Sequence, residues 1–546
     1  MVDATLHEFI EKNIITNEQA NEVIKYKNKY NKQTIHLLYE LGFISKREYL
    51  EYLSKHLNIK FVENLENVRL RNIKIPSNIL KKAMAIPINI KYNQVEVAMA
   101  NPLDWNAKTL IERFFPDKKI ETLLALKEDI DKVLKKIEDK EKITAILNDI
   151  KKELKGEAFQ GDEASVMKLI KYIIVNAINK KASDIHIEAD EEGGEVRLRI
   201  FGSLYEFLDF DADIFQALSS RIKILSGLDV SEKRKPQDGS FSMEFDGNKF
   251  DFRVSTLPTV WGESVVIRIL DKRSILKKLE DIGIEEKNLN FIKKALFQPN
   301  GIFLVTGPTG SGKSTTLYAA LNAIKGVDKK IITVEDPVEY KLPGIQQVPV
   351  NPKVGMTFAS ALRSILRQDP DIIMIGEIRD LETLEIAIKA AMTGHLVIST
   401  LHTNDAVSAI NRMIDMGADS FLVATALVGV EAQRLVKTVC PYCKVIYKPS
   451  DVYLDPIRSI LPKNFVFYKG KGCEKCNMTG FSGRTLITEV FLNDEHLESL
   501  ISKKVEKLEI LNYLKSKGFR TMFYDGLIKS LEGITTLEEV YRVAKI

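Results

Sequence analysis

The stretch that most constrains this chain is GIFLVTGPTGSGKSTTLYAA, residues 301–320. It begins as an apolar strand, passes through a glycine-rich loop and continues as a helix. Residues 307–314 match the pattern G-x-x-x-x-G-K-[ST] in the strand-loop-helix context that phosphate binding requires. Glycines there let backbone N–H groups surround a β-phosphate, and the N-terminus of the following helix adds positive potential. The stretch therefore predicts a nucleoside triphosphate site.

Within this loop, we expect Lys313 to reach the β- and γ-phosphates of ATP and Ser314 to ligate Mg²⁺. A glycine-rich turn with an incidental lysine is the alternative, and it does not account for the flanking strand and helix. The expected nucleotide-binding residues are Gly307, Pro308, Thr309, Gly310, Ser311, Gly312, Lys313, Ser314 and Thr315.

Two further apolar runs, IITVEDPVEY (331–340) and DIIMIGEIRD (371–380), place acids after predicted strands. Strands and helices alternate from about residue 280, which indicates a parallel, doubly wound sheet whose ligands lie at the carboxyl ends of the strands. Glu377 follows Gly376 where the usual pattern has an Asp, and it is our first choice for polarising the attacking water or holding the magnesium shell. Glu335 is the second catalytic acid; solvated loop acids are the alternative.

A histidine closes another predicted strand of this sheet. AMTGHLVISTLHTNDA (391–406) reads as a helix end, a buried strand and a polar loop, with His395 and His402 at the two ends of the strand. His402 is placed to sense the γ-phosphate from a neighbouring strand, whereas a lone histidine is otherwise a structural residue.

The four cysteines occur as two C-x-x-C pairs, in CPYCK (440–444) and GCEKCN (472–477). Each pair can present two thiolates to one ion, so the spacing predicts a single tetrahedral and structural Zn²⁺ site. Disulfides or redox pairs are the alternative, which a reducing compartment disfavours. The expected ligands are Cys440, Cys443, Cys473 and Cys476.

The whole chain has 546 residues and a formal charge of +4, so it is too long for one core and nearly neutral. Wholesale nucleic-acid binding is therefore not indicated. The N-terminus lacks the pattern of a secretory signal, and the longest apolar stretch, 421–430, is about half of a membrane span. We expect a cytoplasmic protein of several domains.

Changes in composition and pattern suggest the domain boundaries. We expect an N-terminal α/β domain (1–135), a charged linker (136–164), a small α/β middle domain (165–275) and a P-loop domain (280–546). The last should contain a cysteine insertion (437–485) and end in helices (493–546). In the middle domain we expect a strand over 195–207 and a hairpin turning at Asp246-Gly247.

Arginines alternate with apolar residues on strands of the middle domain, which places Arg197, Arg199, Arg253 and Arg268 on one face. Ordinarily such residues are solvent-facing charges. If that face meets the P-loop of a neighbouring subunit, its guanidinium groups can stabilise γ-phosphate charge in trans.

Taken together, these motifs resemble the type II secretion and type IV pilus assembly ATPases, a family of ring-forming traffic ATPases. The resemblance covers nearly the whole chain and includes ASDIHIEAD, RVSTLPTVWGESVVIRIL, TVEDPVEY, LRQDPDIIMIGEIRD and GITTLEEV. It implies a RecA-like ATPase domain, a PAS-like middle domain and a homo-hexamer. It also implies acidic catalytic roles for Glu335 and Glu377, and contact of Arg253 and Arg268 with nucleotide across a subunit boundary.

The resemblance further implies a place at the inner face of the cytoplasmic membrane, with an inner-membrane platform protein and associated assembly proteins as partners. The cysteine pairs and the long N-terminal region favour extension or secretion over retraction. Ser240 in PQDGS stands where relatives usually have Arg. LHEFIEKNII and QTIHLLYELGFI lack the Arg of the family's cyclic di-GMP motif, so we favour a partner-docking role for the N-terminal domain.

Three functions compete at this point. The first is a mechanoenzyme in which ATP hydrolysis around a ring moves a platform protein so that pilin subunits are added. The second is a nucleic-acid translocating motor of the DNA-uptake or conjugation type, which should have a basic channel that a charge of +4 does not suggest. The third, a regulatory module without turnover, is disfavoured because both Glu335 and Glu377 are present.

Overall fold

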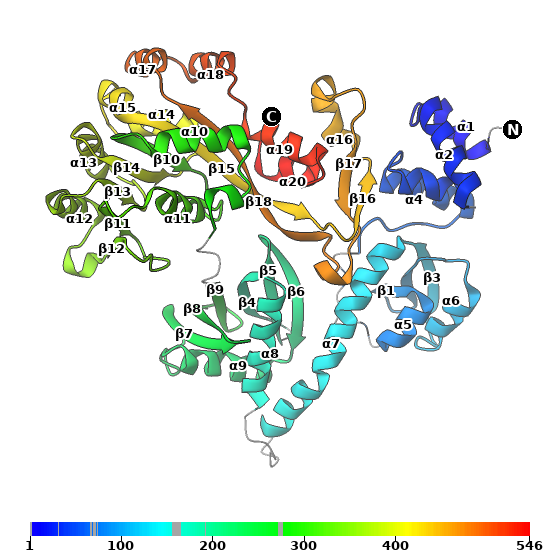
Figure 1. The fold of residues 1–546 in the computed structure, drawn as a ribbon. Coiled ribbons are helices and arrows are strands. Elements are labelled where there is room, and N and C mark those ends of the chain that lie inside the picture. The colour runs from blue at the N-terminus through cyan, green and yellow to red at the C-terminus, as the bar shows by residue number, and fades with distance from the viewer. Residues whose placement is uncertain are drawn as a thin grey trace. The chain divides into compact units, whose positions relative to one another are not determined.

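The computed structural model describes residues 3–30, 32–65, 68, 73, 75–154, 165–191, 193–270 and 277–545 (Figure 1). The α/β fold class expected from the sequence is confirmed. The chain forms two compact units: unit 1 spans Met1–Asp271 and Val439–Ser482, and unit 2 spans Lys272–Thr438 and Gly483–Ile546. Residues 155–164 of the expected linker and 271–275 of the expected middle domain lie outside the described residues. Among the described helices, none is long and apolar enough to cross a membrane.

Unit 1 begins with two helix pairs of similar local structure, α1 (Ala4–Glu11) with α2 (Asn17–Tyr30) and α3 (Thr34–Glu40) with α4 (Lys46–Leu57). The second helix of each pair starts with a reciprocal cap. Thr16 and Gln19 exchange backbone-to-side-chain hydrogen bonds before α2, and Ser45 and Glu48 do the same before α4. Most residues at equivalent positions differ between the pairs, so the sequence alone does not indicate a repeat.

A small α/β layer follows the helix pairs. It contains α5 (Ser77–Ala83), α6 (Trp105–Glu112) and a sheet of β1 (Ala85–Ile90), β2 (Gln94–Met99) and β3 (Lys119–Leu124). β2 pairs antiparallel with β1 and parallel with β3. Helix α7 (Lys127–Leu154) then extends into the segment expected to be a charged linker. Its apolar residues at helical spacing are buried, among them Ile130, Val133, Leu134 and Ile137.

The middle part of unit 1 is an antiparallel sheet in the order β6-β5-β4-β9-β8-β7, with α8 (Ser165–Asn179) and α9 (Ala212–Leu225) packed on it. The strands are β4 (Ala182–Asp190), β5 (Gly193–Ile200), β6 (Ser203–Phe210), β7 (Gln237–Phe245), β8 (Asn248–Pro258) and β9 (Glu263–Leu270). The expected hairpin turn at Asp246-Gly247 is confirmed. The single strand expected over 195–207 is wrong, because Phe201 and Gly202 both have positive φ and turn the chain between β5 and β6.

The remaining part of unit 1, Val439–Ser482, is named here the cysteine insertion. It contains the antiparallel pair β16 (Lys444–Tyr447) and β17 (Phe467–Gly470) and the short helix α16 (Asp451–Leu454). In the sequence it separates β15 (Leu427–Val439) from β18 (Phe481–Leu492), two neighbouring strands of the sheet in unit 2.

Unit 2 is built on a sheet in the order β12-β11-β13-β14-β10-β15-β18. Its other strands are β10 (Gly301–Thr306), β11 (Ile331–Glu335), β12 (Gln346–Pro349), β13 (Ile372–Ile375) and β14 (Leu396–Leu401). The strands from β12 to β15 pair in parallel, and β10, β11, β13 and β14 are buried throughout, as parallel strands covered on both faces are. Alternate residues of β10 enter different cores: Ile302 and Leu304 one, Phe303 and Val305 the other.

Helices cover this sheet and continue beyond it (Figure 1). Those before β15 are α10 (Glu286–Leu296), α11 (Lys313–Ile324), α12 (Phe358–Ile365), α13 (Leu381–Met392), α14 (Val407–Asp415) and α15 (Ser420–Ala426). After β18 come α17 (Glu495–Ser502), α18 (Lys507–Ser516), α19 (Met522–Leu531) and α20 (Leu537–Val543). The parallel strands bring the carboxyl ends of β10, β11, β13 and β14 to one edge of the sheet.

Candidate functional site

The glycine-rich loop joins the carboxyl end of β10 to the N-terminus of α11. Gly307, Gly310 and Gly312 have φ values of 149°, 78° and 97°, a backbone region that side chains disfavour. A Cβ on Gly307 would lie 2.7 Å from the Gln433 carbonyl oxygen, so the loop passes close to the neighbouring strand β15. The loop therefore has the curled backbone that can direct N–H groups toward a phosphate.

Lys313 is the first residue of α11, and its ammonium group turns back over the loop. Nζ donates to the carbonyl oxygens of Gly307 at 2.7 Å and of Pro308 at 3.1 Å. Burial lowers the pKa of Lys313, while the Glu377 carboxylate nearby acts in the opposite direction. Ser314 and Thr315, in the first turn of the same helix, are exposed. The ammonium group thus lies over the loop, and the Ser314 hydroxyl is accessible for a metal ion.

Glu377 and His402 come together at the carboxyl ends of the adjacent strands β13 and β14. The His402 Nε2 atom lies 3.5 Å from the Glu377 Oε2 atom, and Arg379 forms an ion pair with Oε1 of the same carboxylate. The carboxylate of Glu377 raises the pKa of Arg379. Arg379 was missed in the sequence analysis, although it is only two residues beyond Glu377. His395 lies at the other end of β14, with Nδ1 2.9 Å from the Ala390 carbonyl oxygen.

Glu335 ends β11, and its side chain is enclosed by hydrogen-bond donors. Tyr318 on α11 donates to Oε2, while Thr333 at 2.6 Å and Gln347 at 2.9 Å donate to Oε1. The residue is 4% exposed. Burial, followed by the hydrogen bond to Glu335, raises the pKa of Tyr318. The two expected catalytic acids therefore occupy different environments, although both lie at the same edge of the sheet.

Strand β15 supports the glycine-rich loop through residues that the sequence analysis did not identify. Gln433 is fully buried; its Nε2 donates to the Ser311 carbonyl oxygen at 2.9 Å, and its Oε1 accepts from Thr316 at 2.8 Å. Arg434 donates to the carbonyl oxygens of Gln433 and Asn404, each at 3.0 Å, and so joins β15 to the loop that follows His402. The sequence AQRL gave no signal, because these contacts depend on the pairing of β15 with β10.

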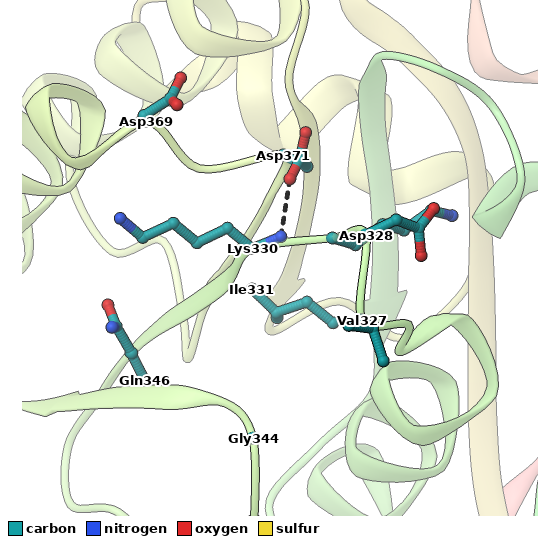
Figure 2. A pocket seen from close by; sticks show the side chains of 9 residues that line it. Val327, Asp328, Lys330, Ile331, Gly344, Gln346, Asp369 and Asp371 are labelled. Atoms are coloured by element: carbon teal, nitrogen blue, oxygen red, sulfur yellow. Dashed lines mark hydrogen bonds between the residues drawn. The ribbon is translucent and has the colours of Figure 1, made fainter.

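A polar pocket of about 430 Å³ lies elsewhere in unit 2 (Figure 2). Its lining includes Lys330, which precedes β11, Asp371, which precedes β13, and Gln346, the first residue of β12. The backbone N–H of Lys330 donates to the Asp371 carboxylate at 2.6 Å. Since these strands are parallel, the pocket lies at their amino ends, at the edge of the sheet opposite the glycine-rich loop. It is not the nucleotide site.

The four cysteines converge at the base of the cysteine insertion. All four Sγ atoms lie within 4.8 Å of one another, and the closest pairs are separated by 3.7–3.9 Å. A tetrahedron with Zn–S bonds of about 2.3 Å places its sulfur atoms about 3.8 Å apart, whereas a disulfide needs about 2.05 Å. The arrangement of Cys440, Cys443, Cys473 and Cys476 therefore fits a closed, four-thiolate metal site.

The arginines of the middle sheet form part of a row that crosses it. Residue pairing aligns Arg199 on β5, Asp184 on β4, Arg268 on β9, Arg253 on β8 and Ser240 on β7. The Asp184 carboxylate is nearly buried and lies 3.0 Å from Arg268 Nε and 3.7 Å from Arg199 Nε. The Asp184 carboxylate thus faces the guanidinium groups of Arg199 and Arg268, and Arg253 follows Arg268 on the next strand.

Comparisons with known proteins agree with this architecture. The sequence model of the family described as type II/IV secretion system protein matches residues 159–542, and that of the MshEN domain matches residues 57–144. The type II secretion system protein E of Dickeya dadantii (strain 3937) is 49% identical over 384 residues, which cover 70% of this chain and 76% of that protein. The type IV pilus assembly ATPase PilB of Myxococcus xanthus (strain DK1622) is 38% identical over 550 residues, 97% of each chain.

Among solved structures, the X-ray structure of the Legionella pneumophila ATPase DotB superimposes with a TM-score of 0.52 at 21% identity. The match covers 69% of this chain and 95% of that one. At this identity the likeness concerns the fold.

Proposed function

The chain belongs to the type II/IV secretion system protein family, and we propose that it is a hexameric motor that drives assembly of a type IV pilus or type II secretion pseudopilus. The chain is an ATPase, as its family and relatives are. The proposal goes further: the motor lies at the cytoplasmic face of the inner membrane and acts through a platform protein. The observation that carries it is the match to a type IV pilus assembly ATPase over 97% of each chain, and the pairing of Glu377 with His402 beside the glycine-rich loop of Lys313 supports the hydrolytic step.

In this proposal the residues of unit 2 have separate roles in ATP hydrolysis. The loop N–H groups and Lys313 hold the β- and γ-phosphates of ATP, and Ser314 together with Glu377 would hold Mg²⁺. The metal ion would neutralise charge on the phosphate oxygens. Glu377 orients the attacking water, and His402, in contact with the same carboxylate, responds to the presence of the γ-phosphate. Gln433 keeps the loop in its curled form through the Ser311 carbonyl.

The substitution Lys313→Ala tests the nucleotide assignment. It removes the charge that bridges the phosphates, so ATP hydrolysis should be abolished while the fold is retained. The matched control is Lys325→Ala, because Lys325 follows the last turn of the same helix and donates to the Pro343 carbonyl away from the loop. Steady-state phosphate release measures both variants. Unchanged turnover in Lys313→Ala refutes the assignment.

We also propose that Arg253 and Arg268 act on the nucleotide of a neighbouring subunit. They belong to unit 1, whereas Lys313 and Glu377 belong to unit 2. The support is the pairing of the two arginines on adjacent strands and the buried Asp184, which fixes Arg268 on the sheet. An arginine supplied in trans can accelerate phosphoryl transfer by about 10³-fold or more. Activity per chain should therefore rise with oligomerisation.

Mixed rings test the action in trans. Arg268→Ala and Lys313→Ala chains are each expected to be inactive alone. In a mixture, some sites combine an intact Lys313 with an intact arginine row from the neighbour, so part of the activity should return. Native mass spectrometry must show that mixed rings form. Mixed rings as inactive as either parent refute the proposal.

For the cysteine insertion we propose one structural zinc ion per chain, held by all four thiolates. Closed sites of this kind contribute folding energy, so Cys476→Ser should lose the metal and destabilise the insertion. Elemental analysis with a thiol count measures the stoichiometry. Four freely reactive thiols in metal-free native protein would contradict the site.

For the N-terminal domain we propose docking to a partner in the inner-membrane machinery, without cyclic di-GMP as its ligand. The support is that LHEFIEKNII and QTIHLLYELGFI lack the Arg of the family's cyclic di-GMP motif, and that Lys12, in the first of these segments, is paired with Glu8. Isothermal titration with cyclic di-GMP should show no heat of binding. Saturable binding overturns this part of the proposal.

A further inference from the structure

The residue that turns the chain between the two helices differs between the two N-terminal helix pairs. It is Asn13 in the first pair, with φ of 55°, and Gly42 in the second, with φ of 72°. Asparagine tolerates this left-handed conformation, as Asn13 shows, so the conformation alone does not require glycine in the second pair.

The atoms of β16 next to Gly42 explain why this position has glycine. A Cβ built there would lie 2.5 Å from Ile446 Cγ2, 2.8 Å from the Tyr447 backbone nitrogen and 2.9 Å from Tyr447 Cα. Two of these three atoms are backbone atoms of β16 in the cysteine insertion, which cannot move aside as a flexible side chain can. Glycine at position 42 therefore allows the second helix pair to lie directly against the insertion.

Two ion pairs bridge the same contact. Lys448, just after β16, lies 3.2 Å from Glu48 on α4, and both side chains are mostly buried. Lys471, just after β17, lies 3.1 Å from Glu128 on α7. The insertion thus supplies the cations and the N-terminal domain the carboxylates, at two separate points.

Between these points Lys469 on β17 inserts among aromatic rings. Its Nζ atom donates to the Tyr39 hydroxyl at 3.1 Å and lies 5.1 Å from the centre of the Tyr39 ring and 5.6 Å from that of Tyr447. Burial lowers the pKa of Lys469 to about 8. Tyr39 belongs to α3 and Tyr447 to β16, so both sides of the contact contribute a ring to one cation.

From this geometry we propose that the cysteine insertion is the docking platform for the chain's own second N-terminal helix pair and the start of α7, with Gly42 as the point of closest approach. Because the insertion interrupts the sequence between β15 and β18, the platform connects the N-terminal domain to two strands of the ATPase sheet. A displacement of the N-terminal domain by a bound partner would then act on the strand that carries Gln433. This last consequence rests on the proposed function; the docking itself does not.

Zero-length crosslinking tests the docking in the full-length protein. A water-soluble carbodiimide joins a carboxylate to an amine only where the two are in direct contact. Peptide mass spectrometry should therefore detect the links Glu48–Lys448 and Glu128–Lys471. The pair Lys46 and Asp129, 2.7 Å apart within the N-terminal domain, is the internal standard. Detection of the standard without the two bridging links would overturn the proposal.

Two variants at the equivalent turn positions of the two helix pairs test the close approach at Gly42. Gly42→Asn keeps the left-handed conformation accessible but places a side chain against β16, so both bridging links should fall to background while the Lys46–Asp129 link remains. Asn13→Gly makes the reciprocal change at the equivalent position and should retain all three links. Bridging links of unchanged intensity in Gly42→Asn would show that the close approach does not exist.

Isotopic mixing identifies which chain provides the platform. Rings reconstituted from ¹⁵N-labelled and unlabelled chains should give bridging links only between peptides of the same label. Mixed-label links would mean that the helix pairs dock on a neighbouring copy, which contradicts docking within one chain. ATP turnover of the mixture, compared with that of unmixed rings, verifies that reconstitution is complete, independently of the links.

Discussion

The carboxyl ends of β11 and β13 carry two glutamates that look equivalent in the sequence but differ in their surroundings. Glu335, after β11, accepts hydrogen bonds from Tyr318, Thr333 and Gln347 and is 4% exposed. Glu377, after β13, instead lies against two basic side chains, Arg379 and His402. The donors to Glu335 are neutral side chains of α11, β11 and β12, so its carboxylate joins three elements of unit 2. We therefore propose a positioning role for Glu335 and the water-orienting role for Glu377, which lies next to His402.

The largest effect should follow from Glu377→Gln, which keeps the shape of the side chain and removes its charge. General bases contribute about 10²–10⁴-fold to a reaction, so turnover should fall at least about 10²-fold while ATP still binds. Nucleotide binding and single-turnover hydrolysis separate the two effects. The control is Glu382→Gln on the exposed face of α13, where the lost partner is the surface residue Arg363. Full activity in Glu377→Gln reverses the assignment of the two acids.

Local motifs allowed most of unit 2 to be predicted. The pattern around Lys313 requires only that a strand precede it and a helix follow, and both occur. The spacing of the two C-x-x-C pairs likewise predicts that the four cysteines come together at one site. Glu335 and Glu377 could be assigned to the same edge of the sheet, but not to their different environments, because the partners of Glu335 come from α11 and from β12, on either side of it in the sequence.

Features that depend on strand register or on distant contacts could not be predicted. The alternation of arginines with apolar residues predicts that the arginines share one face of the sheet. The placement of Asp184 between Arg199 and Arg268, however, depends on the pairing of β4 with both β5 and β9. The support of the loop by Gln433 requires the pairing of β15 with β10. The close approach of β16 to Gly42 is likewise a distant contact, and the sequence contains no sign of it.

A third acid, Glu431 on β15, extends the comparison. It is fully buried, and neither of its carboxyl oxygens has a hydrogen-bond partner among the residues that the structure describes. Burial raises the pKa of Glu431 from 4.5 to about 8. Between these values the folded chain retains a proton that the unfolded chain releases. The free energy of unfolding should therefore fall as the pH rises through this window.

The substitution Glu431→Leu should stabilise unit 2 by a few kcal/mol at about pH 9 and by less at about pH 5, since one pKa unit corresponds to about 1.4 kcal/mol. Glu431→Gln is the control, because it cannot ionise but still buries a polar group. Both tryptophans, Trp105 and Trp261, lie in unit 1, so scanning calorimetry is preferable to tryptophan fluorescence. A stabilisation that does not depend on pH would contradict the raised pKa.

A smaller effect is expected from Glu335→Gln, the isosteric counterpart of Glu377→Gln. It replaces charge-assisted hydrogen bonds by neutral ones, which should lower the free energy of unfolding of unit 2 by about 1–3 kcal/mol. Turnover should fall less than in Glu377→Gln, because the glutamine can still hold Thr333 and Gln347. Calorimetry and phosphate release measure the two quantities on the same preparations. A greater loss of turnover than in Glu377→Gln would exchange the proposed roles.

The smallest effect should come from Tyr318→Phe, which removes the single donor that α11 contributes to Glu335. One hydrogen bond to a buried carboxylate is lost while Thr333 and Gln347 still hold its other oxygen, so the cost should be about 1–2 kcal/mol. Tyr340→Phe is the matched control, since the Tyr340 ring meets the Tyr318 ring edge-on.

Tyr318 lies on α11, the helix that starts with Lys313, so its hydrogen bond to Glu335 joins the nucleotide-binding helix to β11. If Glu335 only positions these elements, Tyr318→Phe should lower stability and leave the turnover number nearly unchanged at saturating ATP. A fall in turnover as large as that of Glu377→Gln would mean that hydrolysis requires the carboxylate of Glu335 to be held in place. The proposed difference in role between Glu335 and Glu377 would then be wrong.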